Sequence, residues 1–521
     1  PAPLAMLSRD AALAALSRGS EGSVLLRRVR VPRACLSDEA LRAAADAEGV
    51  VTCDVGISRG LVSVARLAAP PGSGSDAEAG HDATLDARGA MLWPAFVDAH
   101  THLCKTHAVP RCRNPSGSIN DALACEVTDQ PRWSSPDVGA GRDIERRMDF
   151  ALRSCLHHGT RAVRTHLDGV NAEDEALRSL VYAAFDAARA KYAPLGIALQ
   201  GVANLYLPLY AALPEMAARH ADDAAKHEGV VLGAYCGDVS ASPPGETARA
   251  FDALFALAEA RSLDVDLHVD ENNNPAGCGV EELCGALERA RARGYAGIVT
   301  LGHVTSLSLQ PPETQRGVIA RLASLAPLAV VCNPFTNLGL QDRRGTDPPV
   351  GVAIDRAAPR TPLWRGLTLL QELRAAGVTV AAASDNVRDW WHPYGDYDCL
   401  AVWREAVLAG HLDTAPSEGD WADAVCGAAA SAMGLSGAER GVIEVGARAD
   451  LVLFPNARRC SELLARPHGD RVAIRGGDAI DHPLPTFDEL DDLVEGLELE
   501  VDTEQDVLRG ATKRTLKSSD E

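Results

Sequence analysis

LWPAFVDAHTHL, residues 92–103, is the stretch that decides the fold. Its apolar first half has the character of a buried β-strand, and it ends in His100 and His102, with one residue between them. Alternate side chains of a strand point to the same face, so both imidazoles should project together from the carboxyl end of the strand. Because neutral imidazole is a common metal ligand, the stretch predicts a strand that ends in two ligands.

Outward from this stretch, short apolar runs alternate with Ala- and Leu-rich segments of helical periodicity, such as EELCGALERARARG. Strands that alternate with helices favour a parallel sheet. Eight such runs predict an α/β fold, a (βα)8 TIM barrel, which builds its site at the carboxyl ends of its strands. The predicted strands are residues 96–102, 160–168, 196–206, 230–237, 263–271, 297–303, 328–334 and 378–386.

Ligand-type side chains gather at the predicted strand ends. Any one histidine is more often a core or surface residue than a ligand, but such residues recur here on five strands. They are His100 and His102, His166 and Asp168, His268 and Glu271, His303, and Asp385.

Three imidazoles and one carboxylate suit a single divalent transition metal, Zn²⁺ or Fe²⁺, with water completing the shell. Such a metal lowers the pKa of its water to about 7, which makes hydroxide available at neutral pH. The predicted ligands are His100, His102, His268 and Asp385.

Hydrolysis also needs a group that carries a proton from the water to the leaving group. Glu271 is the best candidate, although strand periodicity does not select it. Asp270 lies two residues past His268 and should share its face, whereas Glu271 turns inward only if the chain has already left the strand. The residues alone leave this choice open.

An ordered set of motifs resembles the cytosine deaminase branch of the amidohydrolase superfamily, over roughly residues 90–480. By motif position, the resemblance implies the same four metal ligands, a proton shuttle at Glu271, and a role for His303 in positioning the water or the substrate. Asp385 then belongs to both the metal and the catalytic set. The resemblance also implies one metal without a carboxylated lysine, and a homo-oligomer. The motifs are FVDAHTHLCKT, VRTHLD, HVDE, LGH, CNP-FTN-LGLQDR and SDNVRDWWHPYG.

The implied activity is hydrolytic deamination of cytosine or a similar amino-substituted nitrogen heterocycle, with release of ammonia. The chain departs from the branch at Cys104, usually aspartate, at Tyr206, near the place of a ring-reading glutamine, and at Asn386, usually a second aspartate. Unpaired buried polar groups cost about 1 to 3 kcal/mol each, so these departures should change which ring is bound. The expected substrate-binding residues are Tyr206, Asn337, Gln341, Asn386 and Trp391.

Two alternatives stay open. A related amidohydrolase that removes an alkylamine from a nitrogen heterocycle, or opens the ring of an ammelide-, creatinine- or cyclic-amide-type compound, would use the same metal cluster. An inactive barrel that serves as a scaffold is the least favoured alternative, because all four ligand residues are present.

The chain divides into four parts. Residues 1–90 are expected to form a tail and part of a small β domain, and residues 91–435 the metal-dependent barrel. Residues 436–485 include GVIEVGARADLVLF, which in the resembling family commonly returns the chain to the small domain, a composite β-sandwich. Residues 486–521 are expected to be a solvated acidic tail.

Composition limits the partners. A formal net charge of -21 should repel phosphate backbones, so nucleic acid is not expected as a partner. The 13 scattered cysteines do not suggest a disulfide framework, and no apolar run is long enough to span a membrane. The expected partner is a small heterocyclic molecule. The expected location is intracellular, the cytoplasm first and an organelle as the alternative.

Overall fold

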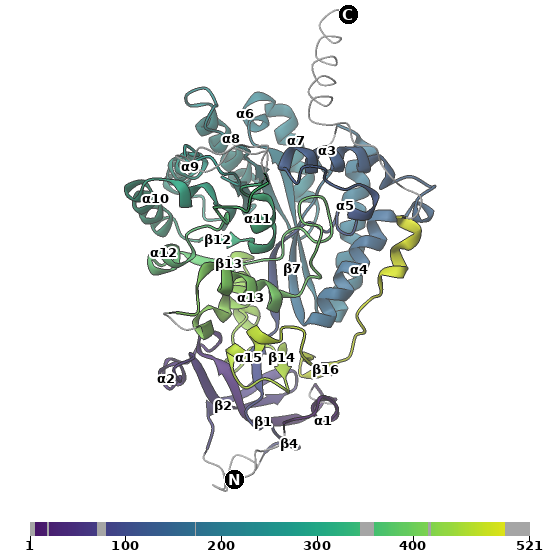
Figure 1. Cartoon of the computed structure of the whole chain (residues 1–521), viewed down its shortest axis with the longest axis vertical. Helices are drawn as coiled ribbons and strands as arrows, with labels where there is room; N and C mark the ends of the chain where they lie inside the picture. The colour runs from purple at the N-terminus through teal and green to yellow at the C-terminus, as the bar shows by residue number, and fades with distance from the viewer. Residues whose placement is uncertain are drawn as a thin grey trace, which may run out of the picture.

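The computed structural model describes residues 6–17, 20–69, 80–171, 173–343, 359–414 and 418–494. These residues form a barrel in the upper part of Figure 1 and a second sheet below it. Most of the predicted acidic tail, residues 495–521, lies outside the described residues. No helix of the described part is both long and apolar enough to cross a membrane.

The barrel consists of eight parallel strands that pair in chain order, so the predicted (βα)8 fold is confirmed. Every residue of β6, β7 and β10 is buried, because helices cover the outside of the strands and side chains fill the inside. The strands are β6 (Phe96–Thr101), β7 (Thr160–His166), β8 (Ala198–Tyr206), β9 (Val230–Tyr235), β10 (Val265–Val269), β11 (Val299–His303), β12 (Leu328–Cys332) and β13 (Thr379–Ala382).

The first and last strands meet just beyond the end of β13. The backbone N–H of Asp385 donates to the carbonyl of His100 over 2.8 Å, and Thr101 and Asp385 form a parallel bridge. The backbone N–H and the hydroxyl of Ser384 both donate to the buried carboxylate of Asp98. This closure brings Asp385 beside the histidines of β6.

Helices surround the barrel and also fill its lower end, where the alanines of α14 pack against small side chains of β6, β12 and β13. The helices are α1 (Arg9–Ala15), α2 (Glu39–Ala43), α3 (Ile119–Asp129), α4 (Asp143–His158), α5 (Glu175–Tyr192), α6 (Leu209–Ala212), α7 (Pro214–Lys226), α8 (Glu246–Arg261), α9 (Gly279–Arg293), α10 (Pro312–Ser324), α11 (Pro334–Leu340), α12 (Leu370–Ala375), α13 (Cys399–Gly410), α14 (Gly427–Ala432) and α15 (Cys460–Ala465).

The second sheet contains strands from both ends of the chain, as predicted for the composite β domain. Its order is β16-β15-β14-β5-β1-β2-β3, with β4 beside β1. β14 pairs with β5, the strand that leads directly into β6, so the returning segment is joined to the base of the barrel. The strands are β1 (Ser23–Pro32), β2 (Val50–Ser58), β3 (Leu61–Leu67), β4 (Ala83–Asp86), β5 (Met91–Pro94), β14 (Leu451–Phe454), β15 (Val472–Arg475) and β16 (Asp478–Ile480).

The first residues of the segment expected as a tail are instead packed against the barrel. Phe487–Leu493 forms a 3-10 helix whose leucines, Leu490 and Leu493, join a cluster with Val138 and Phe150. Ion pairs from α4 to Glu489 and Asp492 hold this helix in place. The acidic composition of the segment predicted a solvated tail, although Leu490 and Leu493 have the spacing of one 3-10 turn.

Candidate metal and substrate site

The predicted metal ligands meet at the carboxyl ends of the barrel strands, the end opposite the second sheet (Figure 1). His102 Nε2 lies 3.2 Å from His268 Nε2 and 3.4 Å from an Asp385 carboxylate oxygen. His100 Nε2 lies 3.6 Å from the same oxygen. Ligands about 2.0 to 2.2 Å from a tetrahedral Zn²⁺ lie about 3.3 to 3.6 Å apart, so this spacing fits one such ion.

The polar atoms at this centre also fit a cation. His100 Nε2 and both carboxylate oxygens of Asp385 are buried and have no hydrogen-bond partner among the described residues. Burial, and then the nearby Glu271, raise the pKa of Asp385 well above its usual value, while Lys105 lowers it. A buried carboxylate without a donor is costly, and a divalent cation would remove that cost.

The imidazoles are held in the form that binds metals. Burial lowers the pKa of His100, His102 and His268 well below the ordinary value, so these rings are neutral at pH 7. The two oxygens of Asp168 each lie 3.1 Å from His102 Nδ1, so this nitrogen donates to the carboxylate and leaves Nε2 to face the centre.

His166, at the end of β7, stands behind His100. Its Nε2 lies 3.1 Å from His100 Nδ1, and its Nδ1 lies 2.9 Å from the amide of Asn204 on β8. His166 thus contacts the predicted ligand His100 at Nδ1, and Asn204 contacts His166 in turn.

Glu271 reaches the site because the chain turns just before it. β10 ends at Val269, and Asp270 has a positive φ of 51°. The Asp270 carboxylate faces away from the site, where it accepts hydrogen bonds from the N–H groups of Gly279 and Val280 at the start of α9, over 3.0 and 2.9 Å. The turn leaves Glu271 facing the cavity, with an oxygen 3.4 Å from His303 Nδ1.

His303 ends β11 and is fixed by two amides. Asn337 lies 3.0 Å from its Nδ1 and Asn333 lies 3.3 Å from its Nε2. Burial lowers the pKa of His303 to about 3, so it is neutral, and burial raises the pKa of Glu271, against the charge of Lys105. A carboxyl group with a raised pKa can both take up and release a proton near neutral pH.

A cavity of about 130 Å³ opens beside these groups. Lys105 lies in its wall, 3.6 Å above the ring of Trp391 and about as close to the carboxylates of Glu126 (3.5 Å) and Asp168 (3.4 Å). The lining residues are His102, Lys105, Ile119, Leu123, Glu126, Leu167, Asp168, Gly169, Asn171, Asn204, Tyr235, His268, Glu271, His303, Asp385, Asn386 and Trp391.

Two of the five expected substrate-binding residues, Asn386 and Trp391, line this cavity, and the other three do not. Tyr206 is 45% exposed at the end of β8, Asn337 bonds His303, and Gln341 is buried against Gly366. The wall near β8 and β9 is formed instead by Asn204 and Tyr235.

Sequence reasoning missed several lining residues, and only one carried a usable signal. Asn204 lies two residues before Tyr206 and so shares its strand face, which made it an equal candidate. Lys105 lies in the turn after β6, and Glu126 lies on α3, whose placement over the barrel the sequence does not define.

The comparisons with known proteins agree with the barrel fold. Residues 227–477 match the model of the Amidohydrolase family. A pterin deaminase from Rhizobium rhizogenes is 37% identical over 448 residues, which cover 86% of this chain and 92% of the relative. The 5-methylcytosine deaminase of Klebsiella pneumoniae has a similar fold, with a TM-score of 0.67 at 20% identity, covering 89% of this chain and 98% of that one. The N-isopropylammelide isopropylaminohydrolase of Burkholderia multivorans has a TM-score of 0.61 at 24% identity, covering 88% and 98%.

A (βα)8 barrel with histidines and an aspartate clustered at its strand ends defines a metal-hydrolase type of site. The chain belongs to the amidohydrolase superfamily, in its deaminase branch, as the ordered motifs predicted.

Proposed function

We propose that the protein is a metal-dependent deaminase that hydrolyses the exocyclic C–N bond of an amino-substituted nitrogen heterocycle and releases ammonia. The observation that carries this proposal is the meeting of three ligand-type groups beside Glu271 and the cavity: His102 Nε2 lies 3.2 Å from His268 Nε2 and 3.4 Å from an Asp385 carboxylate oxygen. The 37% identity to a pterin deaminase supports it.

The residues proposed to hold the metal are His100, His102 and His268 through Nε2, and Asp385 through a carboxylate oxygen. When bound, Zn²⁺ or Fe²⁺ would supply a water of lowered pKa and a site that polarises the substrate. The neutral imidazoles and the buried carboxylate without a donor support this assignment.

In this proposal, Glu271 transfers the protons. One proton must leave the attacking water, and protons must reach a ring nitrogen and the departing amine, so a single group that faces both is required. The buried carboxyl of Glu271 lines the cavity beside His303, whose ring is fixed by the amides of Asn333 and Asn337. His303 would then position the water or the substrate.

The proposed substrate ring is a pterin or a related 2-amino-4-oxo pyrimidine, with cytosine as the smaller alternative. Trp391 would cover one face of the ring. Lys105 offers a donor for a ring oxygen or nitrogen, and Glu126 offers an acceptor for a ring N–H. Each of these side chains lines the cavity.

Ammonia release from pterin, cytosine and 5-methylcytosine, and isopropylamine release from N-isopropylammelide, test the proposal with Zn²⁺- or Fe²⁺-loaded protein. We expect the highest kcat/KM for pterin. Glu271→Gln should keep its metal and lose about 100-fold to 10,000-fold in kcat, the usual effect of removing a general acid–base group.

The matched control is Glu313→Gln on the exposed start of α10, which should behave like the wild type. Ammonia from none of pterin, cytosine and 5-methylcytosine would reject the deaminase proposal. Alkylamine release from N-isopropylammelide alone would favour the alternative amidohydrolase.

A further inference from the structure

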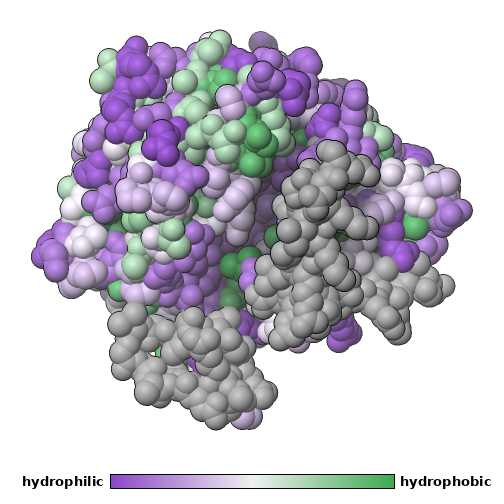
Figure 2. Space-filling view, turned by 90° about the horizontal axis from the view of Figure 1, so that it is seen from above, coloured by the Kyte–Doolittle hydropathy of each residue, from purple (hydrophilic) through white to green (hydrophobic). Residues whose placement is uncertain are grey.

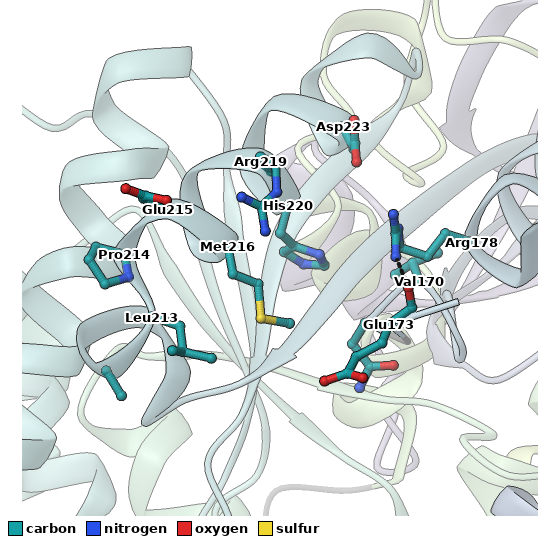
Figure 3. A pocket seen from close by; sticks show the side chains of 12 residues that line it. Val170, Glu173, Arg178, Leu213, Pro214, Glu215, Met216, Arg219, His220 and Asp223 are labelled. Carbon is teal, nitrogen blue, oxygen red and sulfur yellow. Dashed lines mark hydrogen bonds between the residues drawn. The ribbon is translucent and has the colours of Figure 1, made fainter. Parts of the chain in front are cut away.

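A second, larger cavity of about 620 Å³ lies between the start of α7 and the connection from β7 to α5 (Figure 3). Asn171 lines both this cavity and the catalytic cavity, so the two lie next to the same residue. The larger cavity is lined by Val170, Asn171, Glu173, Arg178, Ala212, Leu213, Pro214, Glu215, Met216, Arg219, His220 and Asp223.

The connection from β7 to α5 forms the boundary between the two cavities. Asp168 and Gly169 face the catalytic side, whereas Val170 and Glu173 face the larger cavity. Asn171 itself is exposed. A substituent that leaves a ring in the catalytic cavity would therefore pass over Asn171 and enter the larger space.

One wall of the larger cavity is apolar. Leu213, between α6 and α7, is 48% exposed, and Pro214 and Met216 follow it at the start of α7. Figure 3 shows the side chains of Leu213 and Met216 directed into the space below α7. The molecule's catalytic end is otherwise largely hydrophilic, with hydrophobic residues gathered in patches (Figure 2). An apolar stem would contact this wall favourably.

A guanidinium group is available above the apolar wall. Arg219 lies one turn from both Glu215 and Asp223 on α7, yet it forms no ion pair with a residue of the described ranges. Asp223 is paired instead with Lys226, over 2.6 Å. Arg178 enters from the opposite side and donates to the carbonyl of Glu173 over 2.9 Å (Figure 3).

The carboxylates that line the larger cavity limit the kinds of ligand that it can bind. Glu173, Glu215 and Asp223 offset the two arginines, so the space has no general attraction for anions. Only an anionic group, such as a carboxylate, that reaches a guanidinium directly gains a charge-assisted hydrogen bond. The ligand must therefore place its charge at a defined distance from the ring.

We propose that this cavity is a subsite for a substituent on the heterocycle, with an apolar stem against Leu213 and Met216 and a terminal carboxylate bound by Arg219. This inference rests on the proposed deaminase function, and it deepens that function by defining the substrate as an extended heterocycle rather than a bare ring.

Three compounds test the subsite on the full-length, metal-loaded protein: pterin, a pterin whose C6 arm ends in a benzoate, and the same compound ending in a benzamide. Wild type should prefer the benzoate in kcat/KM. Arg219→Met should lower kcat/KM for the benzoate by about 10-fold to 100-fold, the value of a hydrogen bond to a charged group, and leave the other two within about twofold.

Arg316→Met on the exposed face of α10 is the matched control and should change nothing. Equal kcat/KM for benzoate and benzamide in wild type, or an equal loss on all three compounds in Arg219→Met, would overturn the subsite. If no compound is hydrolysed, the deaminase proposal fails instead. Binding of the benzoate compound, followed by its own fluorescence, then still tests Arg219.

Discussion

The nitrogen of His100 that binds the metal determines which nitrogens of the neighbouring side chains carry a hydrogen. If Nε2 binds the metal, Nδ1 of the neutral ring carries the hydrogen, and that hydrogen points to His166 Nε2 over 3.1 Å. His166 then carries its own hydrogen on Nδ1, which faces the Asn204 amide over 2.9 Å. The structure has Asn204 Nδ2 at this place, so the amide must turn over to present Oδ1, which is buried and has no partner among the described residues as it stands. Amide nitrogen and oxygen are distinguished only by such networks.

This chain of hydrogen bonds predicts opposite results for two substitutions at Asn204. Asn204→Asp keeps an acceptor for His166 and should hold the metal as tightly as the wild type. Asn204→Leu removes the acceptor and should weaken metal binding about 10-fold to 100-fold, the usual effect of losing such a partner. Competition with a chromophoric chelator measures both without any need for turnover.

Equal weakening in the two variants would mean that Asn204 donates rather than accepts. It would also favour the alternative in which His166 is itself a ligand, since the ligand atoms of His100, His166 and His268 lie within 4.8 Å of one another.

Among the elements, the turn between β10 and α9 decides which carboxylate enters the site. Asp270 caps α9 through two backbone N–H groups, and this bond pattern holds its backbone at positive φ. Asn and Asp tolerate that conformation better than other residues with side chains. Glu271 faces the cavity as a consequence.

Asp270→Ala should therefore cost both stability and turnover. The lost cap predicts a decrease of about 0.5 to 2 kcal/mol in the free energy of unfolding, measured by denaturant titration. The loosened turn should also lower kcat. Asp174→Ala is the matched control, because Asp174 caps α5 through the N–H groups of Ala176 and Leu177, away from the cavity. If Asp270→Ala lost as much stability as Asp174→Ala but kept the wild-type kcat, this would contradict a role for Asp270 in orienting Glu271.

The same elements show what a sequence can predict. The eight strands were identifiable because parallel strands buried on both faces must be apolar throughout, and the histidines stood out at their polar ends. The choice between Asp270 and Glu271 was not identifiable, because α9 sets it from nine residues away. Lys105 and Glu126 were missed for a related reason: their directions depend on how α3 packs over the barrel, which no local periodicity encodes.

In the whole molecule, the site depends on a barrel whose first strand is continuous with the second sheet. β5 leads into β6, and the segment around β15 is tied to the barrel by Arg471. This arginine forms two hydrogen bonds to the buried carboxylate of Asp398, over 2.7 and 2.8 Å, and Asp398 in turn caps α13. The pair joins segments that are 73 residues apart in the chain.

Arg471→Met should strongly destabilise the protein, because it leaves the buried carboxylate of Asp398 without its guanidinium partner. Breaking a buried ion pair in this way costs about 3 to 5 kcal/mol. Arg289→Met, which breaks an exposed pair with Asp252, is the control and should cost at most about 1 kcal/mol. Denaturant unfolding at pH 7 compares the two variants with the wild type.

The pH dependence of this loss has a defined sign. Burial alone would raise the pKa of Asp398, but Arg471 and His158 hold it at about 2, below the ordinary value. A depressed pKa stabilises the folded state fully above the unfolded-state pKa of about 4, by about 2 to 3 kcal/mol, and this contribution disappears as the pH falls through 2. In Arg471→Met burial raises the pKa of Asp398, so the difference in unfolding free energy between wild type and variant should be largest near pH 7 and shrink as the pH falls toward 2. A difference that stays constant down to pH 2 would show that Arg471 stabilises the junction by packing and not through the charge of Asp398.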